Sequence, residues 1–218
     1  MRKFNTILLV IIFAGLLSAC AKSQLTADTL PWVGAKPVLF KDSFARKNGG
    51  WTTSEDSLSF SGYVDGKFRL WLDVPDYQIW SVPGLNFKNI HIAARVEKVG
   101  GPDNNFFGVL CRYQDPMNYY SFVISSDGYY GVYKVVNGDK SLMGQQSMEF
   151  DSAINQGDAV NDIQAVCQDN QFEFIVNSTQ LIQVQDDSLS FGDVGLLAGN
   201  LDEPGVEILF DHFVVIKP

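Results

Sequence analysis

The stretch Lys67-Phe-Arg-Leu-Trp-Leu-Asp-Val74 alternates apolar and polar side chains without a break. A β-strand sends successive side chains to opposite faces, so this period of two predicts a strand with one face in the core. The stretch Asn89–Val96 repeats the pattern. The residues expected to face the core are Phe68, Leu70, Leu72 and Val74 in the first stretch and Ile90, Ile92, Ala94 and Val96 in the second.

Further short strands follow at close intervals, and Gly, Asn, Asp and Pro separate them. The Asp127-Gly128 pair between two aromatic-rich stretches is typical of a β-hairpin. The additional predicted strands are Asn105–Tyr113, Asn118–Ser126, Tyr129–Val136, Ala159–Gln168, Gln171–Asn177, Gln180–Gln185, Val194–Gly199 and Val206–Lys217. No sustained helical period follows residue 20, so the sequence predicts an all-β protein, a two-sheet antiparallel β-sandwich or jelly roll.

The chain begins with an export pattern: Arg2 and Lys3, the apolar run Ile7–Leu17, and then Leu17-Ser-Ala-Cys20. This pattern resembles the signal and lipobox of bacterial lipoproteins, in which the Cys is diacylated and becomes the new N-terminus. The expected organisation is a signal peptide over residues 1–19, an acylated Cys20 with a tether to residue 36, and a sandwich domain over residues 37–218. The alternative is an ordinary signal peptide followed by an unmodified Cys.

The charge balance limits the class of partner. A formal net charge of −9 argues against nucleic acid and against adsorption on anionic lipid headgroups. Membrane attachment would come from the acyl chains, which predicts an exported protein anchored to the bacterial envelope. Ala21 follows the lipobox Cys where an inner-membrane retention signal would have Asp, so outer-membrane delivery is permitted in a Gram-negative cell. No Gly-rich phosphate loop leads into a helix, so nucleotide binding is not expected.

Two further cysteines, Cys111 and Cys167, form an even pair in an exported chain. A disulfide between them would stabilise the fold by about 4 kcal/mol in the chain-entropy model. The alternative is two buried thiols that act as small apolar groups.

Residues in the middle of the chain carry a family resemblance: Gly108–Arg112, Asn118–Phe122, Asp127-Gly128 and Lys134. This order resembles bacterial exported domains with the concanavalin A-like (laminin-G-like) jelly roll, relatives of the 3-keto-disaccharide hydrolases among them. The resemblance covers roughly Val38 to Lys217. It implies the jelly-roll fold, with carbohydrate binding and one structural calcium ion as frequent properties of such domains.

Ligand binding is expected from aromatic and fork-like side chains on one sheet face. Trp71 lies on the polar face of its strand, and Trp80 lies close to a Pro-Gly turn. Alternation with Val109, Cys111 and Tyr113 predicts that Arg112 points away from the core. By the resemblance, Arg112, Tyr120 and Lys134 would form a groove floor. The alternative for all five residues is packing of long side chains over aromatic neighbours.

Calcium binding and catalysis each have candidate residues. By analogy with the family, Asp42 near the first strand and Asp211 in the last one could meet at a sheet edge and hold calcium. Glu149-Phe-Asp151 matches part of a glucanase carboxylate motif without its third acid, and it reads as a solvated loop. Of the two histidines, His91 reads as a surface residue and His212 as a structural one.

These patterns favour a non-catalytic, lipid-anchored envelope protein that binds carbohydrate or another envelope component on one sheet face. A glycoside or keto-sugar hydrolase is the alternative, and a structural or protein-interaction module is a third interpretation. The sequence names no particular ligand, since fold does not imply function.

Overall fold

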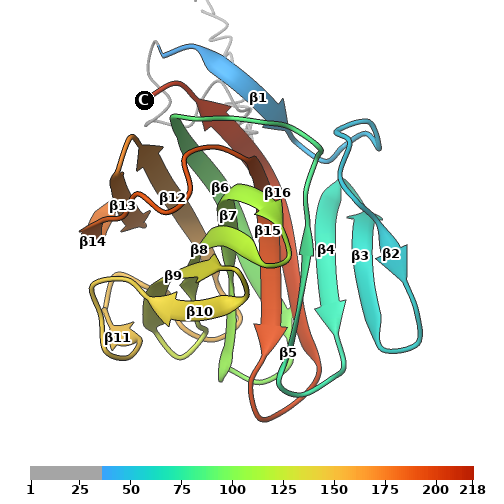
Figure 1. Ribbon diagram of the computed structural model, residues 1–218. Coiled ribbons are helices and arrows are strands. Elements are labelled where there is room, and N and C mark those ends of the chain that lie inside the picture. Colours follow the sequence, from blue (N-terminus) through green and yellow to red (C-terminus); the bar gives the residue numbers. More distant parts are fainter. Residues whose placement is uncertain (1–35) are drawn as a thin grey trace, which may run out of the picture.

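Residues 36–218, described by a computed structural model, form two antiparallel sheets that pack face to face (Figure 1). Every regular element in this range is a strand, so the prediction of an all-β sandwich is confirmed. The signal peptide, Cys20 and the tether up to residue 35 lie outside the described residues. Between residues 36 and 218 there is no helix that could span a bilayer.

The first sheet has nine strands, in the order β14-β13-β12-β6-β16-β4-β3-β2, with β1 paired to β16 as well. Both β4 and β1 pair with β16, β4 at its start and β1 at its end. The strands of this sheet are β1 (Val38–Asp42), β2 (Ser54–Glu55), β3 (Ser59–Val64), β4 (Lys67–Leu72), β6 (Ile90–Gly100), β12 (Val160–Gln168), β13 (Gln171–Val176), β14 (Thr179–Gln185) and β16 (Val206–Ile216).

The second sheet has seven strands, in the order β10-β9-β8-β7-β15-β5, with β11 paired to β9. It is strongly twisted: β9 and β10 run across the view of Figure 1, whereas β15 runs down it. Its strands are β5 (Tyr77–Ser81), β7 (Asn105–Asp115), β8 (Asn118–Ile124), β9 (Tyr129–Val136), β10 (Asp139–Leu142), β11 (Glu149–Phe150) and β15 (Asp193–Asn200).

The main core lies between the two sheets, and the alternating stretches supply it as predicted. Of the eight residues expected to face inward, all but Val74 are fully buried in this core, and Val74 packs against it half-buried. Cys111 of β7 and Cys167 of β12 form a disulfide that joins the two sheets, which confirms the predicted pair. One segment differs from the prediction: Glu149–Phe150, which reads as a loop, pairs with Tyr129–Tyr130 as β11.

Candidate functional site

The outer face of the first sheet carries ion pairs that connect its strands. Lys67 pairs with Glu97 at 2.8 Å, Arg69 with Glu207 at 2.8 Å, and Arg95 with Asp162 through two hydrogen bonds of 2.8 and 2.9 Å. These pairs join β4, β6, β12 and β16 across the sheet. Since each of these cations already has a carboxylate partner, the face resembles an ordinary solvated surface.

Trp71 lies on this charged face, half-buried among its neighbours. The guanidinium of Arg69 lies 5.8 Å from the ring centre of Trp71 and 5.3 Å from that of Phe60. Phe60 is also the cross-strand partner of Trp71. Trp71 is thus packed against an aromatic ring and an arginine, and its predicted role as a ligand platform stays a prediction.

The outer face of the second sheet is different in kind, because it carries a second apolar cluster. Its floor is formed by fully buried residues of β7, β8, β9 and β15, and half-buried aromatic side chains lie over that floor. We call the ring-bearing surface the aromatic face and define it by five residues: Trp80, Phe106, Tyr113, Tyr119 and Tyr133.

Hydrogen bonds and ring contacts order the aromatic face. The indole N–H of Trp80 donates to the hydroxyl of Tyr113 at 3.1 Å, and the Tyr113 and Tyr119 rings lie 6.0 Å apart. The amide of Gln78 donates to the hydroxyl of Tyr119 at 2.9 Å. Burial raises the pKa of both tyrosines, so their hydroxyls stay protonated and remain available as donors at neutral pH.

The bond between Gln78 and Tyr119 also shows that this face curves inward. Gln78 lies on β5 and Tyr119 on β8, and two strands, β15 and β7, lie between them. The strand pairs place Gln78 level with Phe106 of β7 and the Ile124 end of β8, whereas Tyr119 lies at the other end of β8, about 20 Å further along the strands. Two extended side chains could cross three strand spacings of about 14 Å over a flat sheet, but they could not also span this offset, so the sheet bends toward its outer face. The outer face of the second sheet is therefore concave across β5 to β8.

Lys140 of β10 adds a positive charge to the aromatic face, at the far side of the sheet from β5. Its ammonium lies 4.6 Å from the ring centre of Tyr133 and 5.2 Å from that of Phe106. The ring of Phe106 lies flat over Gly199 of β15. A side chain at position 199 would collide with it, since a Cβ there would come within 2.2 Å of the ring. A flat ring next to an exposed cation is suited to a ligand with both an apolar face and polar edges.

Arg112 requires a correction, because the structure places it inside the molecule. Its φ of 52° lies in the left-handed region, within a register irregularity between Cys111 and Asp115. This irregularity breaks the alternation on which the prediction depends, and the side chain turns inward until only 1% of the residue is exposed. The prediction that Arg112 faces a groove is therefore wrong.

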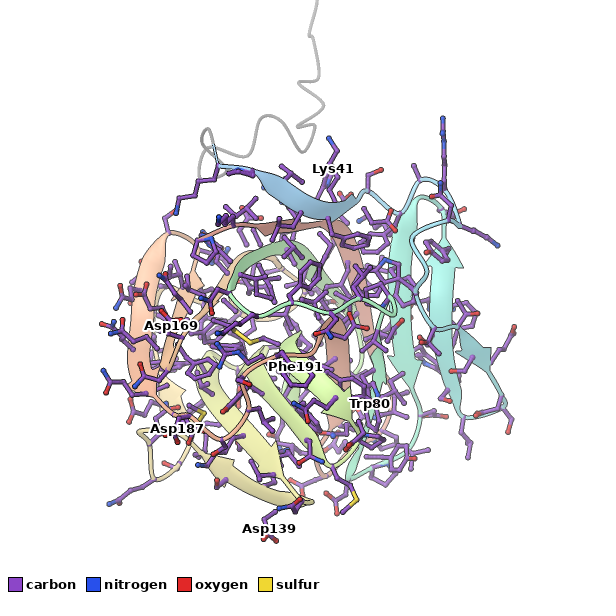
Figure 2. The ribbon with its side chains drawn as sticks, turned by 45° about the horizontal axis from the view of Figure 1, so that its top comes forward. Lys41, Trp80, Asp139, Asp169, Asp187 and Phe191 are labelled. Atoms are coloured by element: carbon purple, nitrogen blue, oxygen red, sulfur yellow. A yellow bond between two sulfur atoms is a disulfide. The ribbon has the colours of Figure 1, made fainter. Side chains whose placement is uncertain are left out.

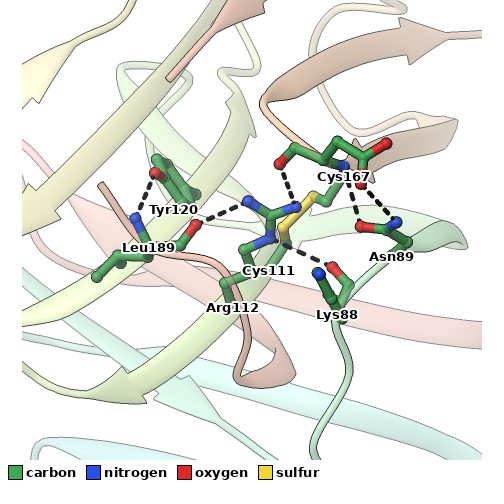
Figure 3. Close-up of a disulfide and its surroundings, with 8 residues drawn as sticks. Lys88, Asn89, Cys111, Arg112, Tyr120, Cys167 and Leu189 are labelled. Atoms are coloured by element: carbon green, nitrogen blue, oxygen red, sulfur yellow. Dashed lines mark hydrogen bonds between the residues drawn. A yellow bond between two sulfur atoms is a disulfide. The ribbon is translucent and has the colours of Figure 1, made fainter. Parts of the chain in front are cut away.

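The guanidinium of Arg112 binds three backbone carbonyls from separate segments (Figure 3). It donates to Lys88 at 3.3 Å, to Leu189 at 2.7 Å and to Asp169 at 2.7 Å. It also lies 5.0 Å from the ring centre of Phe172. Burial lowers the pKa of Arg112, and the guanidinium holds three connections of the chain together beside the disulfide.

Tyr120 and Lys134 lie near Arg112, but on the inner face of the second sheet. The Tyr120 hydroxyl donates to Asp186 at 2.6 Å and accepts from the Leu189 backbone N–H at 3.0 Å, and Lys134 also pairs with Asp186. Burial and the bond to Asp186 raise the pKa of Tyr120. Burial opposes ionisation of Asp186, but its bonds from Lys134, Tyr120 and Ser188 outweigh this and lower its pKa.

We call this group the Arg112 clamp, defined by Arg112, Tyr120, Lys134 and Asp186. The structure places the first three residues near one another, which is the grouping that the resemblance implies. The chain segment after β14 covers them, so they do not form the predicted groove floor. Tyr120 is fully buried, and Lys134 is half-buried through its bond to that segment. A ligand would have to displace the protein's own backbone to reach them.

The predicted calcium pair is also wrong. Asp42 accepts hydrogen bonds from the Phe44 backbone N–H at 2.7 Å and from the indole of the buried Trp51 at 3.0 Å. Asp211 instead pairs with His212 at 2.8 Å and acts on Arg95 at the outer face. The two carboxylates lie on opposite faces of the first sheet. Within residues 36–218 no cluster of three or more His, Cys, Asp or Glu side chains could hold a metal ion.

The remaining acid and histidine candidates have local partners. Glu149 accepts a hydrogen bond from the Tyr130 hydroxyl at 3.0 Å, and burial together with this carboxylate raises the pKa of Tyr130 to about 12. Asp151 accepts from the Ala153 backbone N–H at 2.8 Å. His91 lies 2.8 Å from Gln164, and burial lowers its pKa. These contacts are those of structural side chains.

The sequence predicts one member of the aromatic face, Trp80, and misses the rest. Tyr119 and Tyr133 read as core or cross-strand packing, which is also what many tyrosines do in β-sheets. A usable signal is present in β7, whose residues Phe106 to Cys111 are apolar or Gly at both parities. A strand that is apolar on both sides needs cover for its second face, and here aromatic side chains provide it.

Comparisons of sequence identify no relatives. No protein-family model matches the chain, and no curated protein matches it.

Solved structures with similar folds are numerous. A carbohydrate-binding module CBM66 from Bacillus subtilis aligns with a TM-score of 0.60 at 13% identity, covering 77% of this chain and 96% of the module. A Bacillus subtilis protein of unknown function with a galectin-like fold gives 0.63 at 11% identity over 84% and 97%. The β-glucanase of Bacillus licheniformis gives 0.60 at 12% identity over 82% and 98%. These likenesses show a galectin-like and concanavalin A-like jelly roll, and no more than the fold.

Proposed function

We propose that this protein binds glycan through the aromatic face, without catalysing a reaction, at the surface of a bacterial envelope to which an acylated Cys20 anchors it. The observation that carries the proposal is the inward-curved aromatic face with polar groups on it. The apolar side of a sugar ring packs on aromatic rings, and its hydroxyls need donors and acceptors. Gln78, Lys140 and the tyrosine hydroxyls supply these groups.

Similar folds among carbohydrate-active proteins support this choice over a purely structural module. The CBM66 structure is a carbohydrate-binding module, and the glucanase acts on glycans, as their names state. At 12–13% identity these names support carbohydrate as a ligand class without giving a particular sugar.

The non-catalytic part of the proposal rests on the carboxylates. Glycoside hydrolysis uses two carboxyl groups on either side of the scissile bond, at separations of about 5–10 Å. The acids that act on Tyr113 at one end of the aromatic face, Asp115 and Asp193, already accept hydrogen bonds from backbone N–H groups. Glu149 and Asp151 are likewise bound to their own surroundings. A hydrolase would need an acid pair at the ligand, and these acids do not provide one.

The anchor accounts for how an acidic protein would stay on a membrane. Two acyl chains on one residue give stable attachment without any basic surface. Replacing Cys20 by Ala should release the protein from the membrane fraction of the producing cell and leave its N-terminus free of lipid in intact-mass analysis. Retention of the Cys20→Ala protein in that fraction would contradict the anchor.

The binding face is tested with one tryptophan from each sheet. Trp80→Ala should weaken retention on a glycan array and in titration at least about tenfold, because it removes a ring from the aromatic face. Trp71→Ala is the matched change on the charged face and should leave binding unaltered. The melting temperature of each variant reports whether it is folded.

The opposite result, loss of binding with Trp71→Ala and not with Trp80→Ala, would move the site to the first sheet. Full binding by both variants would refute the proposal that either ring is a platform.

A further inference from the structure

A small pocket opens beside the aromatic face, at the end where β7 and β15 meet. It has a volume of about 330 Å³, and Tyr113, Gln114, Phe191 and Asp193 are among its lining residues. The volume falls at the lower end of the range for small-ligand sites. Figure 2 labels Phe191 and Trp80 below Lys41 of β1. We call this cavity the side pocket.

The walls of the side pocket are held in place by the chain itself. Phe87 and Gly192 exchange two backbone hydrogen bonds of 2.8 and 3.0 Å, which join the connection after β5 to the connection before β15. Gly192 lies so close to β7 that a Cβ there would come within 2.5 Å of the Arg112 backbone carbon. Gln114 donates to the Phe191 backbone carbonyl at 3.0 Å. The pocket is therefore built by backbone contacts rather than by loose side chains.

Asp193 is the unusual residue of the side pocket. It is only 6% exposed, and its carboxylate accepts from the Gly84 backbone N–H at 2.7 Å and from that of Val194 at 2.8 Å. Burial raises the pKa of this carboxyl, and the N–H groups of Val194, Leu85 and Gly84 oppose the shift. All these partners are neutral, whereas buried charges in proteins are normally paired with an opposite charge.

Tyr113 makes the side pocket continuous with the aromatic face. The same side chain lines the pocket and accepts the hydrogen bond of Trp80. Phe191 also lines the pocket, and this residue is 50% exposed although it is large and apolar. A sugar in the pocket would lie beside two rings, close to a carboxylate that lacks a cation, and next to the rest of a chain on the aromatic face.

We propose that the side pocket takes the protonated amine of an amino sugar, with the Asp193 carboxylate as its counter-ion and with Tyr113 and Phe191 against the sugar ring. This inference rests on the proposed function, because it assigns a ligand class to one end of the same glycan site. The net charge of −9 also favours the approach of a cationic glycan.

The test compares two glycans that differ only in the amine. A β-linked tetramer of glucosamine and its fully N-acetylated counterpart are titrated into the purified full-length protein, at a pH where the amines are protonated. The glucosamine tetramer should bind about tenfold more tightly. Asp193→Asn keeps one of the two acceptor oxygens for the loop N–H groups and should abolish the preference. Asp187→Asn, the same charge change at an exposed residue, should keep it.

A second variant covers the case in which Asp193→Asn does not fold. Phe191→Ala removes an exposed ring of the side pocket and should weaken binding of both tetramers, whereas Phe150→Ala, at an equally exposed ring outside the pocket and the aromatic face, should not. Equal affinity of the wild-type protein for the two tetramers would overturn the amine site and leave glycan binding standing. Failure of both tetramers to bind would overturn the amine site and count against the proposed function together.

Discussion

Arg112 in β7 and Trp80 in β5 belong to the same sheet, yet their side chains lie on opposite faces of it. Both read from the sequence as ligand-binding residues. In the Arg112 clamp the polar groups are saturated by the protein, because three carbonyls and one carboxylate take the places a ligand would use. On the aromatic face, Tyr119 is buried in the floor, but the rings of Trp80, Phe106, Tyr113 and Tyr133 stay partly exposed.

This comparison shows that a side chain with suitable chemistry binds a ligand only if the protein leaves it accessible. Arginine, tyrosine and lysine are as suitable for a sugar as tryptophan is, but those of the Arg112 clamp are occupied by the segment after β14. Predictions of large stability effects therefore belong to the clamp, and predictions of binding effects belong to the aromatic face. Each variant below tests one side of this division.

The largest expected loss of stability comes from the disulfide beside the clamp. Cys111→Ala together with Cys167→Ala should lower the free energy of unfolding by about 4 kcal/mol, because the bond closes a long loop between the two sheets. Urea denaturation measures the change, and reduction of the wild-type protein should reproduce it. Glycan affinity of the folded fraction should persist. A folded double variant without affinity would break the division between the two regions.

Arg112→Met should be the next largest change, a loss of about 3 kcal/mol, because three carbonyls lose a charged donor while the volume stays filled. The control is Arg95→Met on the charged face. That arginine has a paired but partly exposed carboxylate, and its removal should cost less than about 1 kcal/mol. Equal costs for the two variants would mean that the clamp is no more than another surface ion pair.

Asp186 should make the clamp sensitive to acid. Its folded pKa lies below the unfolded value of 3.8, so its contribution to stability is present above that value and is lost as pH falls through the lower folded pKa. Asp186→Asn should cost about 2 kcal/mol at neutral pH and flatten the decline of the melting temperature in acid.

Asp187→Asn, at the neighbouring exposed residue, is the control for Asp186→Asn. It should leave the decline of the melting temperature at acid pH unchanged. An unchanged acid limb in Asp186→Asn would show that the clamp does not depend on the ionised carboxylate.

Much of the fold follows from side-chain periodicity. The strands with one apolar face, such as Lys67–Leu72 and Ile90–Gly100, are predicted with their buried residues, and so is the pair Cys111 and Cys167. Short edge elements are not predicted. Few side chains are buried in two such elements, Val38–Asp42 and Tyr77–Ser81. Because neither has a face that must be apolar, their sequences lack the alternation of apolar and polar residues that is typical of a half-buried strand.

The site is harder to predict because its position depends on two non-local facts. The left-handed backbone at Arg112 turns that side chain to the inner face of the sheet, and no pattern of alternation in the sequence indicates this turn. The inward curve of the second sheet brings Gln78 of β5 to Tyr119 of β8, which are 41 residues apart in sequence. Tyrosine in a strand fits packing and binding equally well, and only the arrangement of neighbouring strands distinguishes the two.

The smallest and most discriminating change uses two adjacent tyrosines of β8 whose side chains lie on opposite faces. Tyr119→Phe removes only the acceptor of Gln78 and should cost about 1 kcal/mol, since water can replace it at the half-exposed amide. Tyr120→Phe removes a hydroxyl that bonds both Asp186 and Leu189 in the interior, and it should cost about 2 kcal/mol. Urea denaturation gives both values.

Titration with a bound glycan should show the opposite order: weaker affinity for Tyr119→Phe and unchanged affinity for Tyr120→Phe. If Tyr120→Phe alone weakened binding, the ligand would have to reach the inner face, and the Arg112 clamp would be part of the site after all.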